Sequence, residues 1–87
     1  MGWFLYVIEC KDGSLYTGIA VDPEARFVAH AAGKGARYTR SHPPKRLLRT
    51  LAFPDRSSAS KAEHQVKQMP ADEKRRFALG KDPWTSN

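Results

Sequence analysis

Residues 3–21, WFLYVIECKDGSLYTGIAV, decide how the chain begins to fold. Two apolar runs, Trp3–Cys10 and Leu15–Val21, flank the polar segment Lys11-Asp12-Gly13-Ser14. An Asp-Gly pair between two apolar runs is a strong short-range signal for a β-hairpin. The segment therefore predicts two antiparallel strands joined by a tight turn.

The length of this turn decides which side chains share a face of the hairpin. Side chains alternate along a strand, and residues directly opposite one another share a face. A two-residue loop would put Tyr6 and Tyr16 on opposite faces, whereas a loop of residues 11–13 would put both phenols on one face, with Tyr6 opposite Gly18. Gly13 suits the left-handed position that closes the longer loop. We predict the three-residue loop, with Gly18 leaving space beside the Tyr6 ring.

Length and composition predict a small domain over residues 1–80, with 81–87 as a short C-terminal tail. The single cysteine, Cys10, cannot form an internal disulfide, which favours a reducing, cytoplasmic setting. No apolar run is long enough to span a bilayer, and the N-terminus lacks the features of a signal peptide. We expect a cytoplasmic protein with no membrane partner.

The positive charge of the chain is unevenly distributed. The net charge is +6, and no acidic residue occurs between Glu24 and Asp55. That span contains seven basic residues, namely Arg26, Lys34, Arg37, Arg40, Lys45, Arg46 and Arg49. A patch of one sign attracts polyanions such as nucleic acids. A solvated basic face is the alternative, and an acidic lipid surface is a weaker one because no amphipathic helix carries the cluster.

A first helix is predicted after the hairpin. Asp22 suits the N-cap, the next residues are Pro and Glu, and the helix should run to Ala32 and end at Gly33. Arg26 and His30 are four residues apart and should share one face. Its core side is expected to carry Phe27, Val28 and Ala31.

The second half of the chain predicts a loop, a strand and two helices. Residues 33–44 are rich in Gly, Pro and charge, which predicts a loop. Lys45–Phe53 is predicted as a central or doubly covered strand, since apolar side chains occur on both of its faces. Leu47, Leu51 and Phe53 are expected on one face, and Leu48 and Ala52 on the other.

The last two elements are helices. The first should be capped by Ser57 and should bury a stripe of residues at three- and four-residue steps, with Glu63 at its edge: Ala59, Ala62, Val66 and Met69. The second should run from Pro70 to Leu79 and end at Gly80. The order β-β-α-β-α-α predicts an α/β (α+β-type) fold, a small, mainly antiparallel three-stranded sheet flanked by helices.

The ordered motifs resemble the GIY-YIG nuclease superfamily. They are Leu5-Tyr6-Val7, Tyr16-Thr17-Gly18 and Arg26-Phe27-Val28-Ala29-His30, followed by Glu63 in a later helix. Segments 10–19 and 33–39 resemble in particular the small single-domain bacterial proteins of that superfamily. The chain departs from the pattern by lacking the glycine of the first motif, and Ile19 stands where some relatives carry lysine.

The resemblance implies a metal-dependent endonuclease that hydrolyses phosphodiester bonds, with DNA as the first expected substrate and RNA as a second, in DNA repair or processing. Tyr6 would take a proton from the attacking water, and Tyr16 would orient that water or hold the phosphate. Arg26 would bind the scissile phosphate, and His30 would contact the phosphate or shuttle a proton. Glu63 would hold a single Mg²⁺ or Mn²⁺ ion.

The residues taken singly leave other interpretations open. Tyr6 and Tyr16 also suit a half-buried strand, Arg26 a helix surface, and Glu63 a salt bridge to Arg26. Acting as a base near neutral pH would require the pKa of Tyr6 to fall by roughly 2–3 units from its usual value of about 10. Two other functions remain open, a nucleic-acid-binding module with little cleavage and a scaffold for a protein partner.

The basic loop predicts backbone contacts to nucleic acid, with weak sequence preference and affinity that falls with salt. The residues expected to make these contacts are Lys34, Arg37, Tyr38, Arg40, Lys45 and Arg46.

Overall fold

The computed structural model describes residues 2–80 and contains seven elements there. In chain order they are β1 (Trp3–Cys10), β2 (Leu15–Ala20), α1 (Pro23–Ala31), α2 (Arg37–Ser41), β3 (Pro44–Phe53), α3 (Arg56–Lys67) and α4 (Ala71–Ala78). The expected order of three strands and three longer helices is confirmed, with the short helix α2 added. The predicted tail, residues 81–87, lies outside the described residues. No helix within residues 2–80 has both the length and the apolar character that crossing a membrane requires.

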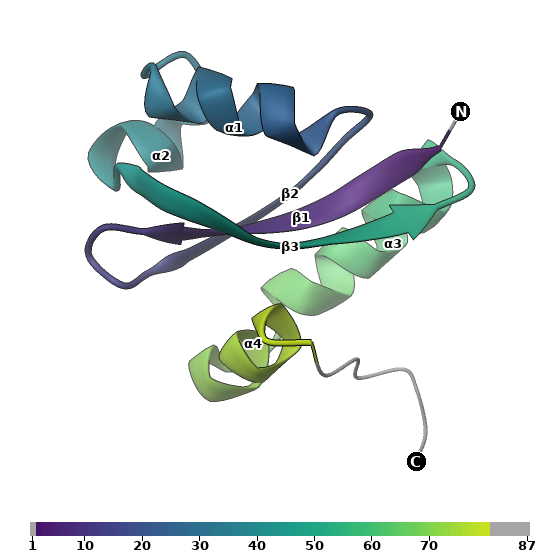
Figure 1. Cartoon of the computed structure of the whole chain (residues 1–87). Helices are drawn as coiled ribbons and strands as arrows, with labels where there is room; N and C mark the ends of the chain where they lie inside the picture. Colours follow the sequence, from purple (N-terminus) through teal and green to yellow (C-terminus); the bar gives the residue numbers. More distant parts are fainter. Residues whose placement is uncertain (1, 81–87) are drawn as a thin grey trace.

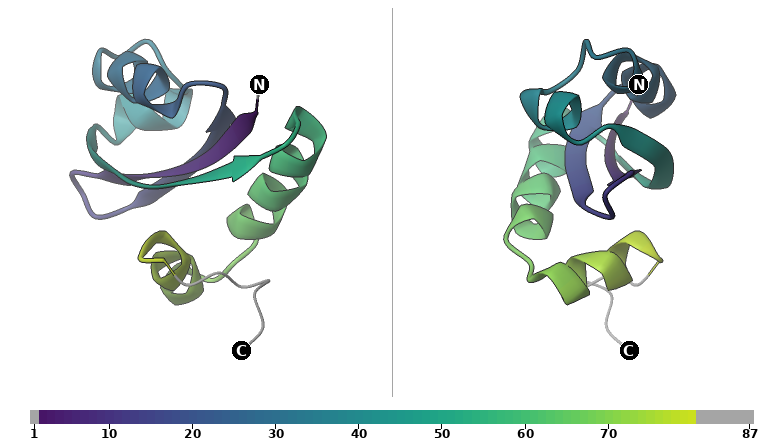
Figure 2. Two further views of the ribbon diagram at one scale, coloured as in Figure 1. Left: turned by 45° about the vertical axis from the view of Figure 1, so that its right-hand side comes forward. Right: turned by 90° about the vertical axis from the view of Figure 1, so that its left-hand side faces the viewer.

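The three strands form one antiparallel sheet in the order β2-β1-β3. Helices α1 and α2 lie over one face of this sheet, and α3 and α4 lie over the other (Figure 1, Figure 2). The central strand β1 is therefore covered on both faces, which explains why its sequence is a nearly continuous apolar run.

The hairpin has the register predicted for a three-residue loop. Tyr6 lies opposite Gly18, and Ile8 lies opposite Tyr16. Gly13 adopts a φ of 88°, and its N–H donates to the Cys10 carbonyl over 2.9 Å. The Asp12 carboxylate also stabilises the turn, because it accepts hydrogen bonds from the backbone N–H and the hydroxyl of Ser14. The two phenols consequently share the face covered by α1.

Alternation along β1 produces two cores of different character. Leu5 and Val7 point toward α3 and α4, where they pack with Val66 and Phe77 in a purely apolar cluster. Burying each such side chain stabilises the fold by about 1.5–3 kcal/mol. The opposite face carries Tyr6, Ile8, Cys10 and Ala20, with Tyr16, Phe27 and Leu47 packed against them. The second core therefore contains two phenols.

The prediction for the core side of α1 is wrong for two of its three residues. Phe27 packs on the sheet, but Val28 is 65% exposed and Ala31 is also exposed. His30 takes the inward position instead and is 1% exposed. The sheet offers hydroxyl groups on this face, so the side chain that can hydrogen-bond to them is buried in place of an aliphatic one.

Two local predictions about loops and caps are also wrong. The segment expected to be a loop contains helix α2, whose start is tightened by the Thr39 hydroxyl donating to the Ala36 carbonyl over 2.9 Å. Helix α3 is capped by Asp55, not by Ser57, because the Asp55 carboxylate accepts the backbone N–H and the hydroxyl of Ser58. An Asp two residues before a Ser competes for the same cap position, and here the Asp fills it.

Strand β3 lies at an edge of the sheet, so the predicted central position is wrong, and Thr50 and Ala52 are exposed on the α1 side; its apolar side chains also do not follow strict alternation. The pairing with β1 shifts between Val7 and Ile8, so one extra residue of β3 is accommodated there. As a result Leu47 packs in the α1-side core, while Leu48 joins Leu51 and Phe53 in the α3-side core. The predicted faces of Leu47 and Leu48 are therefore interchanged, because a β-bulge reverses the alternation.

The close contact between Gly18 and Tyr6 generates a stability prediction. A Cβ on residue 18 would lie 2.5 Å from the Tyr6 hydroxyl oxygen and 2.7 Å from its Cζ. We expect Gly18→Ala to lower the free energy of unfolding by about 1–3 kcal/mol, measured by urea denaturation, because the buried ring must shift. The penalty should be smaller in a Tyr6→Phe background, where the nearest atom is gone. Equal penalties in both backgrounds would contradict the contact.

Candidate active site

Tyr6 lies at the centre of the polar core. Its side chain projects from the central strand toward α1 and is 1% exposed. Its hydroxyl oxygen is 3.0 Å from the Nε2 of His30, and the missing side chain of Gly18 makes room for the ring. This hydrogen bond joins the sheet to α1 across the interior of the protein.

His30 is held on both ring nitrogens. Its Nδ1 lies 2.8 Å from the Thr39 hydroxyl oxygen and accepts the Ala36 backbone N–H over 3.2 Å. With the ring proton on Nε2, Nδ1 accepts the Ala36 N–H and Nε2 donates to the Tyr6 oxygen; with the proton on Nδ1, that N–H donates to the Thr39 oxygen and Nε2 accepts the Tyr6 hydroxyl. The backbone at Gly35 packs so closely on the imidazole that no Cβ fits there. His30 is therefore a buried histidine with a fixed orientation.

Burial keeps the imidazole neutral. It lowers the pKa of His30 below its ordinary value, and the positive charge of Arg26 lowers it further. A neutral ring donates at one nitrogen and accepts at the other, which matches hydrogen-bond partners on both sides of the imidazole.

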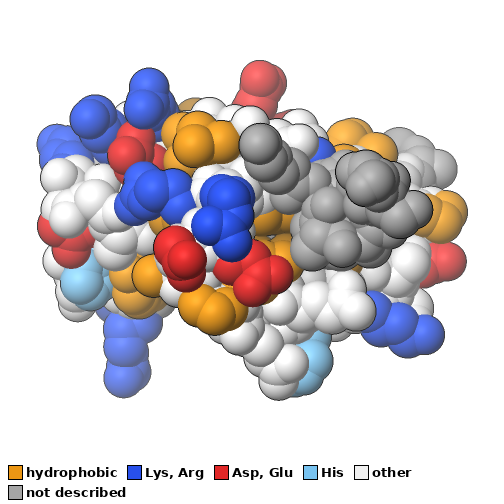
Figure 3. Space-filling model, turned by 90° about the horizontal axis from the view of Figure 1, so that it is seen from below, with side chains coloured by type: hydrophobic (Ala, Val, Ile, Leu, Met, Phe, Trp, Pro, Cys, Tyr) orange, Lys and Arg blue, Asp and Glu red, His pale blue; other side chains and the backbone are white. Residues whose placement is uncertain are grey.

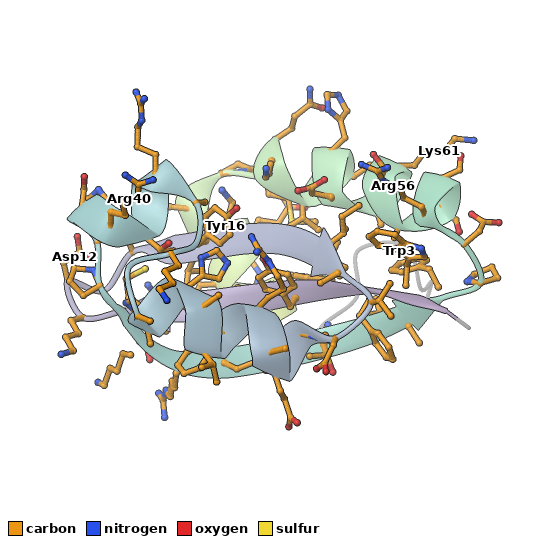
Figure 4. The ribbon with its side chains drawn as sticks, turned by 90° about the horizontal axis from the view of Figure 1, so that it is seen from above. Trp3, Asp12, Tyr16, Arg40, Arg56 and Lys61 are labelled. Carbon is orange, nitrogen blue, oxygen red and sulfur yellow. The ribbon has the colours of Figure 1, made fainter. Side chains whose placement is uncertain are left out.

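Tyr16 lies beside this pair and is partly exposed. Its ring centroid is 6.3 Å from that of Tyr6 and 5.2 Å from that of His30, the latter in an edge-on arrangement. Figure 4 shows Tyr16 between the helices above the sheet and α3. The two phenols and the imidazole therefore form a single cluster, with Tyr16 toward its solvent side.

Arg26 and Glu63 reach the same cluster from opposite sides of the sheet. Burial raises the pKa of Tyr6 above its ordinary value, and the nearby Tyr16 raises it further. Arg26, as a hydrogen-bond partner and a positive charge, lowers the Tyr6 pKa, whereas Glu63 raises it slightly. The net direction is upward, so Arg26 alone does not offset burial. All five residues predicted as catalytic are thus brought together around Tyr6.

The ion pair of Glu63 differs from the one considered in the sequence. Its carboxylate lies 3.1 Å from the Nζ of Lys67, one helical turn further along α3. The same ammonium lies 5.9 Å from the centroid of the Tyr16 ring. Lys67 is a residue that sequence reasoning missed, although its spacing of four residues from Glu63 on a predicted helix would have indicated the pair.

The donor set suits a cation that is bound mostly by non-protein ligands. Within residues 2–80, no three His, Cys, Asp or Glu side chains gather into a metal-binding group. Glu63 presents one carboxylate, 21% exposed, close enough to Tyr6 to influence its pKa. Mg²⁺ is commonly held by one or two carboxylates, with waters and substrate phosphates completing its shell. The residues present fit that mode of binding.

Helix α2 adds an aromatic stack that the sequence did not reveal. The Tyr38 ring stacks on Tyr16 at 5.7 Å between centroids and on His42 at 4.2 Å. The Nδ1 of His42 is 2.6 Å from a carboxylate oxygen of Asp12. The hydrogen bonds from Ser14, and then the one from His42, hold the pKa of the Asp12 carboxyl well below its usual range. The hairpin turn is thereby connected to α2 and to the Tyr16 ring. Thr39, His42 and Gly35 have no periodic signal, so only the fold brings them here.

The predicted nucleic-acid-binding residues divide between two regions. Lys34, Arg37, Tyr38 and Arg40 lie in or just before α2, and all four are exposed. Lys45 and Arg46 lie on β3, where the Nε of Arg46 is 2.7 Å from the Glu9 carboxylate. Glu9 also pairs with Arg75 of α4, on the other face of the sheet. Seen from below, that face carries acidic and basic side chains next to one another (Figure 3). Arg46 is therefore not gathered with the α2 group.

Comparison with known proteins places this site in a family. A family model described as the GIY-YIG catalytic domain matches residues 2–84. A UPF0213 protein of Cupriavidus pinatubonensis is 52% identical over 75 residues, which are 86% of this chain and 83% of the relative. A UPF0213 protein of Xanthomonas axonopodis pv. citri is 52% identical over 68 residues, which are 78% of this chain and 67% of the relative.

Solved structures with the same arrangement support the match. The solution NMR structure of a UPF0213 protein from Bacillus halodurans is 42% identical, with a TM-score of 0.59, and the match covers 97% of this chain and 90% of that one. The solution NMR structure of a protein from E. faecalis is 33% identical, with a TM-score of 0.60, and the match covers 99% and 96%. The chain belongs to the GIY-YIG catalytic domain family, a family of nucleases that act on nucleic acids.

Proposed function

We propose that the protein is a metal-dependent endonuclease that hydrolyses nucleic-acid phosphodiester bonds. DNA is the preferred substrate, RNA a further one, and cleavage is structure-selective or weakly specific, in repair or processing. One observation carries the proposal: the Tyr6 hydroxyl is hydrogen-bonded to His30 and lies close enough to Arg26 and Glu63 for both charges to act on its pKa. A buried phenol with this surrounding is costly to build for packing alone.

Tyr6 acts as the group that accepts a proton from the attacking water. To do so it must be a phenolate, and a ring proton on the Nε2 of His30 and the guanidinium of Arg26 would both stabilise negative charge on its oxygen. In this role His30 orients and supports Tyr6 and does not touch the phosphate, since both of its nitrogens are engaged. The upward direction of the Tyr6 pKa means that further positive charge is required.

The Glu63 carboxylate is the group that would bind this additional positive charge. A divalent ion held by its carboxylate would lower the pKa of nearby acids and stabilise the developing charge on phosphate oxygens. It would also replace a negative charge near Tyr6 by a net positive one. Glu63 would hold one such ion, Mg²⁺ or Mn²⁺, and waters and phosphate oxygens would supply the other ligands.

Arg26 and Tyr16 bind the substrate at the open side of the cluster. Arg26 is exposed on α1, and its planar guanidinium suits two parallel hydrogen bonds to a phosphate. Tyr16 offers a partly exposed hydroxyl beside it, for the water or a phosphate oxygen. The rest of the strand is bound by the exposed side chains around α2, Lys34, Arg37, Tyr38 and Arg40. Lys45 contributes less, and Arg46 less again because Glu9 neutralises it.

A second function is favoured by two particular observations. The pKa of Tyr6 is raised, and Lys67 already neutralises Glu63. Both are compatible with a nucleic-acid-binding module that keeps the family fold but cleaves slowly. The two functions differ in whether a divalent cation changes the covalent state of the nucleic acid.

Cleavage should depend on Glu63 and Tyr6. We expect Glu63→Gln and Tyr6→Phe each to lower the rate of Mg²⁺- or Mn²⁺-dependent nicking of supercoiled DNA by about 100-fold or more, because each removes a group that acts in the transition state. Glu73→Gln on α4, on the other face of the sheet, is the matched control and should stay within about twofold. Binding without any metal-stimulated nicking by the wild-type protein would instead support the binding module.

The raised pKa of Tyr6 predicts how cleavage responds to pH. If the phenolate is the active form, its fraction rises about tenfold per pH unit below its pKa. We expect kcat/KM with Mg²⁺ to increase with a slope close to one between about pH 6 and pH 8. The Lys61→Ala variant, changed on exposed helix surface, should keep the same slope. A rate independent of pH in this range would exclude Tyr6 as the proton acceptor.

The α2 group predicts how binding responds to salt. The double variant Arg37→Ala/Arg40→Ala should weaken binding to a DNA duplex and lower the slope of log affinity against log salt by about two, because two phosphate contacts are lost. Fluorescence anisotropy in EDTA measures this without cleavage. Arg46→Ala is the control: it also removes a positive charge, but one that is paired with Glu9, and it should change the slope by less than one. A larger effect from Arg46 than from the α2 pair would reverse the assignment of the binding surface.

A further inference from the structure

The one cation seen in direct contact with the Glu63 carboxylate is Lys67, in the part of the chain that the structure describes. Its Nζ is 3.1 Å from a Glu63 carboxylate oxygen. Both residues lie on α3, one turn apart, so the pair forms without moving the backbone. The carboxylate is 21% exposed and the lysine side chain 49% exposed, so the lysine covers the more buried partner.

Lys67 is also held on the site side of α3 by a second contact. Its ammonium lies 5.9 Å from the centroid of the Tyr16 ring, within the range in which a cation is attracted to an aromatic face. Two contacts of different kinds, one with the carboxylate and one with the ring, thus hold the Lys67 ammonium at the edge of the cluster. If the first contact is lost, the second keeps the ammonium beside Tyr16.

We propose that Lys67 is a positioning residue of this site, whose ammonium holds and neutralises the Glu63 carboxylate until a divalent cation takes its place. The inference rests on the proposed function, in which Glu63 binds that cation. The ammonium and the metal ion compete for one carboxylate, because two cations cannot both lie against it without strong repulsion. Lys67 therefore weakens metal binding to the free protein and limits it to occasions when phosphate oxygens add further ligands.

Once released from Glu63, the Lys67 ammonium is free to bind the nucleic acid. Once the carboxylate is bound to a metal ion, the ammonium remains over the Tyr16 ring, at the open side where the nucleic acid is bound. A lysine has three donors on a flexible stem, so a short rotation is enough to reach a phosphate oxygen. Metal binding and phosphate binding are thereby coupled through one side chain.

The test measures Mn²⁺ binding by the full chain in the absence of nucleic acid. Paramagnetic broadening of amide NMR signals along α3 reports the affinity, even when binding is weak. We expect Lys67→Ala to bind Mn²⁺ about threefold to tenfold more tightly than the wild type, since the competing charge is gone. Lys67→Arg should restore the wild-type affinity. Lys61→Ala removes the same charge from the middle of α3, at a position that lies away from Tyr16 (Figure 4), and should change nothing.

The possible results separate this inference from the proposed function. Unchanged or weaker Mn²⁺ binding in Lys67→Ala, or an equal gain in Lys61→Ala, would overturn it even if the wild-type protein nicks DNA. Binding that survives Glu63→Gln would overturn it as well, because the carboxylate would not be the shared ligand. Tighter Mn²⁺ binding in Lys67→Ala without nicking by any variant would support the competition and contradict the endonuclease.

Discussion

The hydrogen bond between the Tyr6 hydroxyl and His30 Nε2 is the interaction on which the rest of the site depends. At 3.0 Å it connects the central strand to α1 through the interior of the protein. The far side of the same imidazole is held by Thr39 and the Ala36 backbone, which connects α1 to α2. One ring thus fixes three elements relative to one another. A purely apolar contact would give similar burial but would not define which way the phenol points.

The two faces of the sheet carry cores of different character. The core between the sheet, α3 and α4 is built mainly from aliphatic and aromatic side chains. The α1-side core contains Tyr6 with His30 as its partner, and desolvation there moves the two pKa values in opposite directions, the phenol upward and the imidazole downward. Both groups are therefore neutral near pH 7, which avoids burying a charge. That neutrality stabilises the fold but leaves the phenol a poor base.

The sequence predicted the parts of this arrangement that depend on local rules. The turn closed by Gly13 fixed the register and hence the shared face of Tyr6 and Tyr16, and a spacing of four brought Arg26 and His30 together on α1. The same rules failed where tertiary contacts decide. Val28 is more apolar than His30, yet it is exposed, because His30 takes the inward position and hydrogen-bonds to Tyr6. The bulge that exchanges Leu47 and Leu48 leaves no mark in the local hydrophobic pattern. Thr39 and His42 act through contacts with distant residues, which one sequence alone does not disclose.

The charges around Tyr6 explain why such a site would need a cation that is not part of the chain. Arg26 is exposed, so water screens its effect on the buried phenol, and Glu63 opposes it. Adding another fixed basic residue close to Tyr6 would lower its pKa permanently, but that residue would be buried and repelled by Arg26 in the resting protein. A charge that arrives with the substrate avoids this cost. Lys67 serves the same purpose, since its ammonium neutralises the Glu63 carboxylate when no metal ion is bound. On this reasoning the charges of the resting site favour a neutral Tyr6 and a stable fold. Only a bound metal ion and nucleic acid add the positive charge that would lower the Tyr6 pKa enough for catalysis.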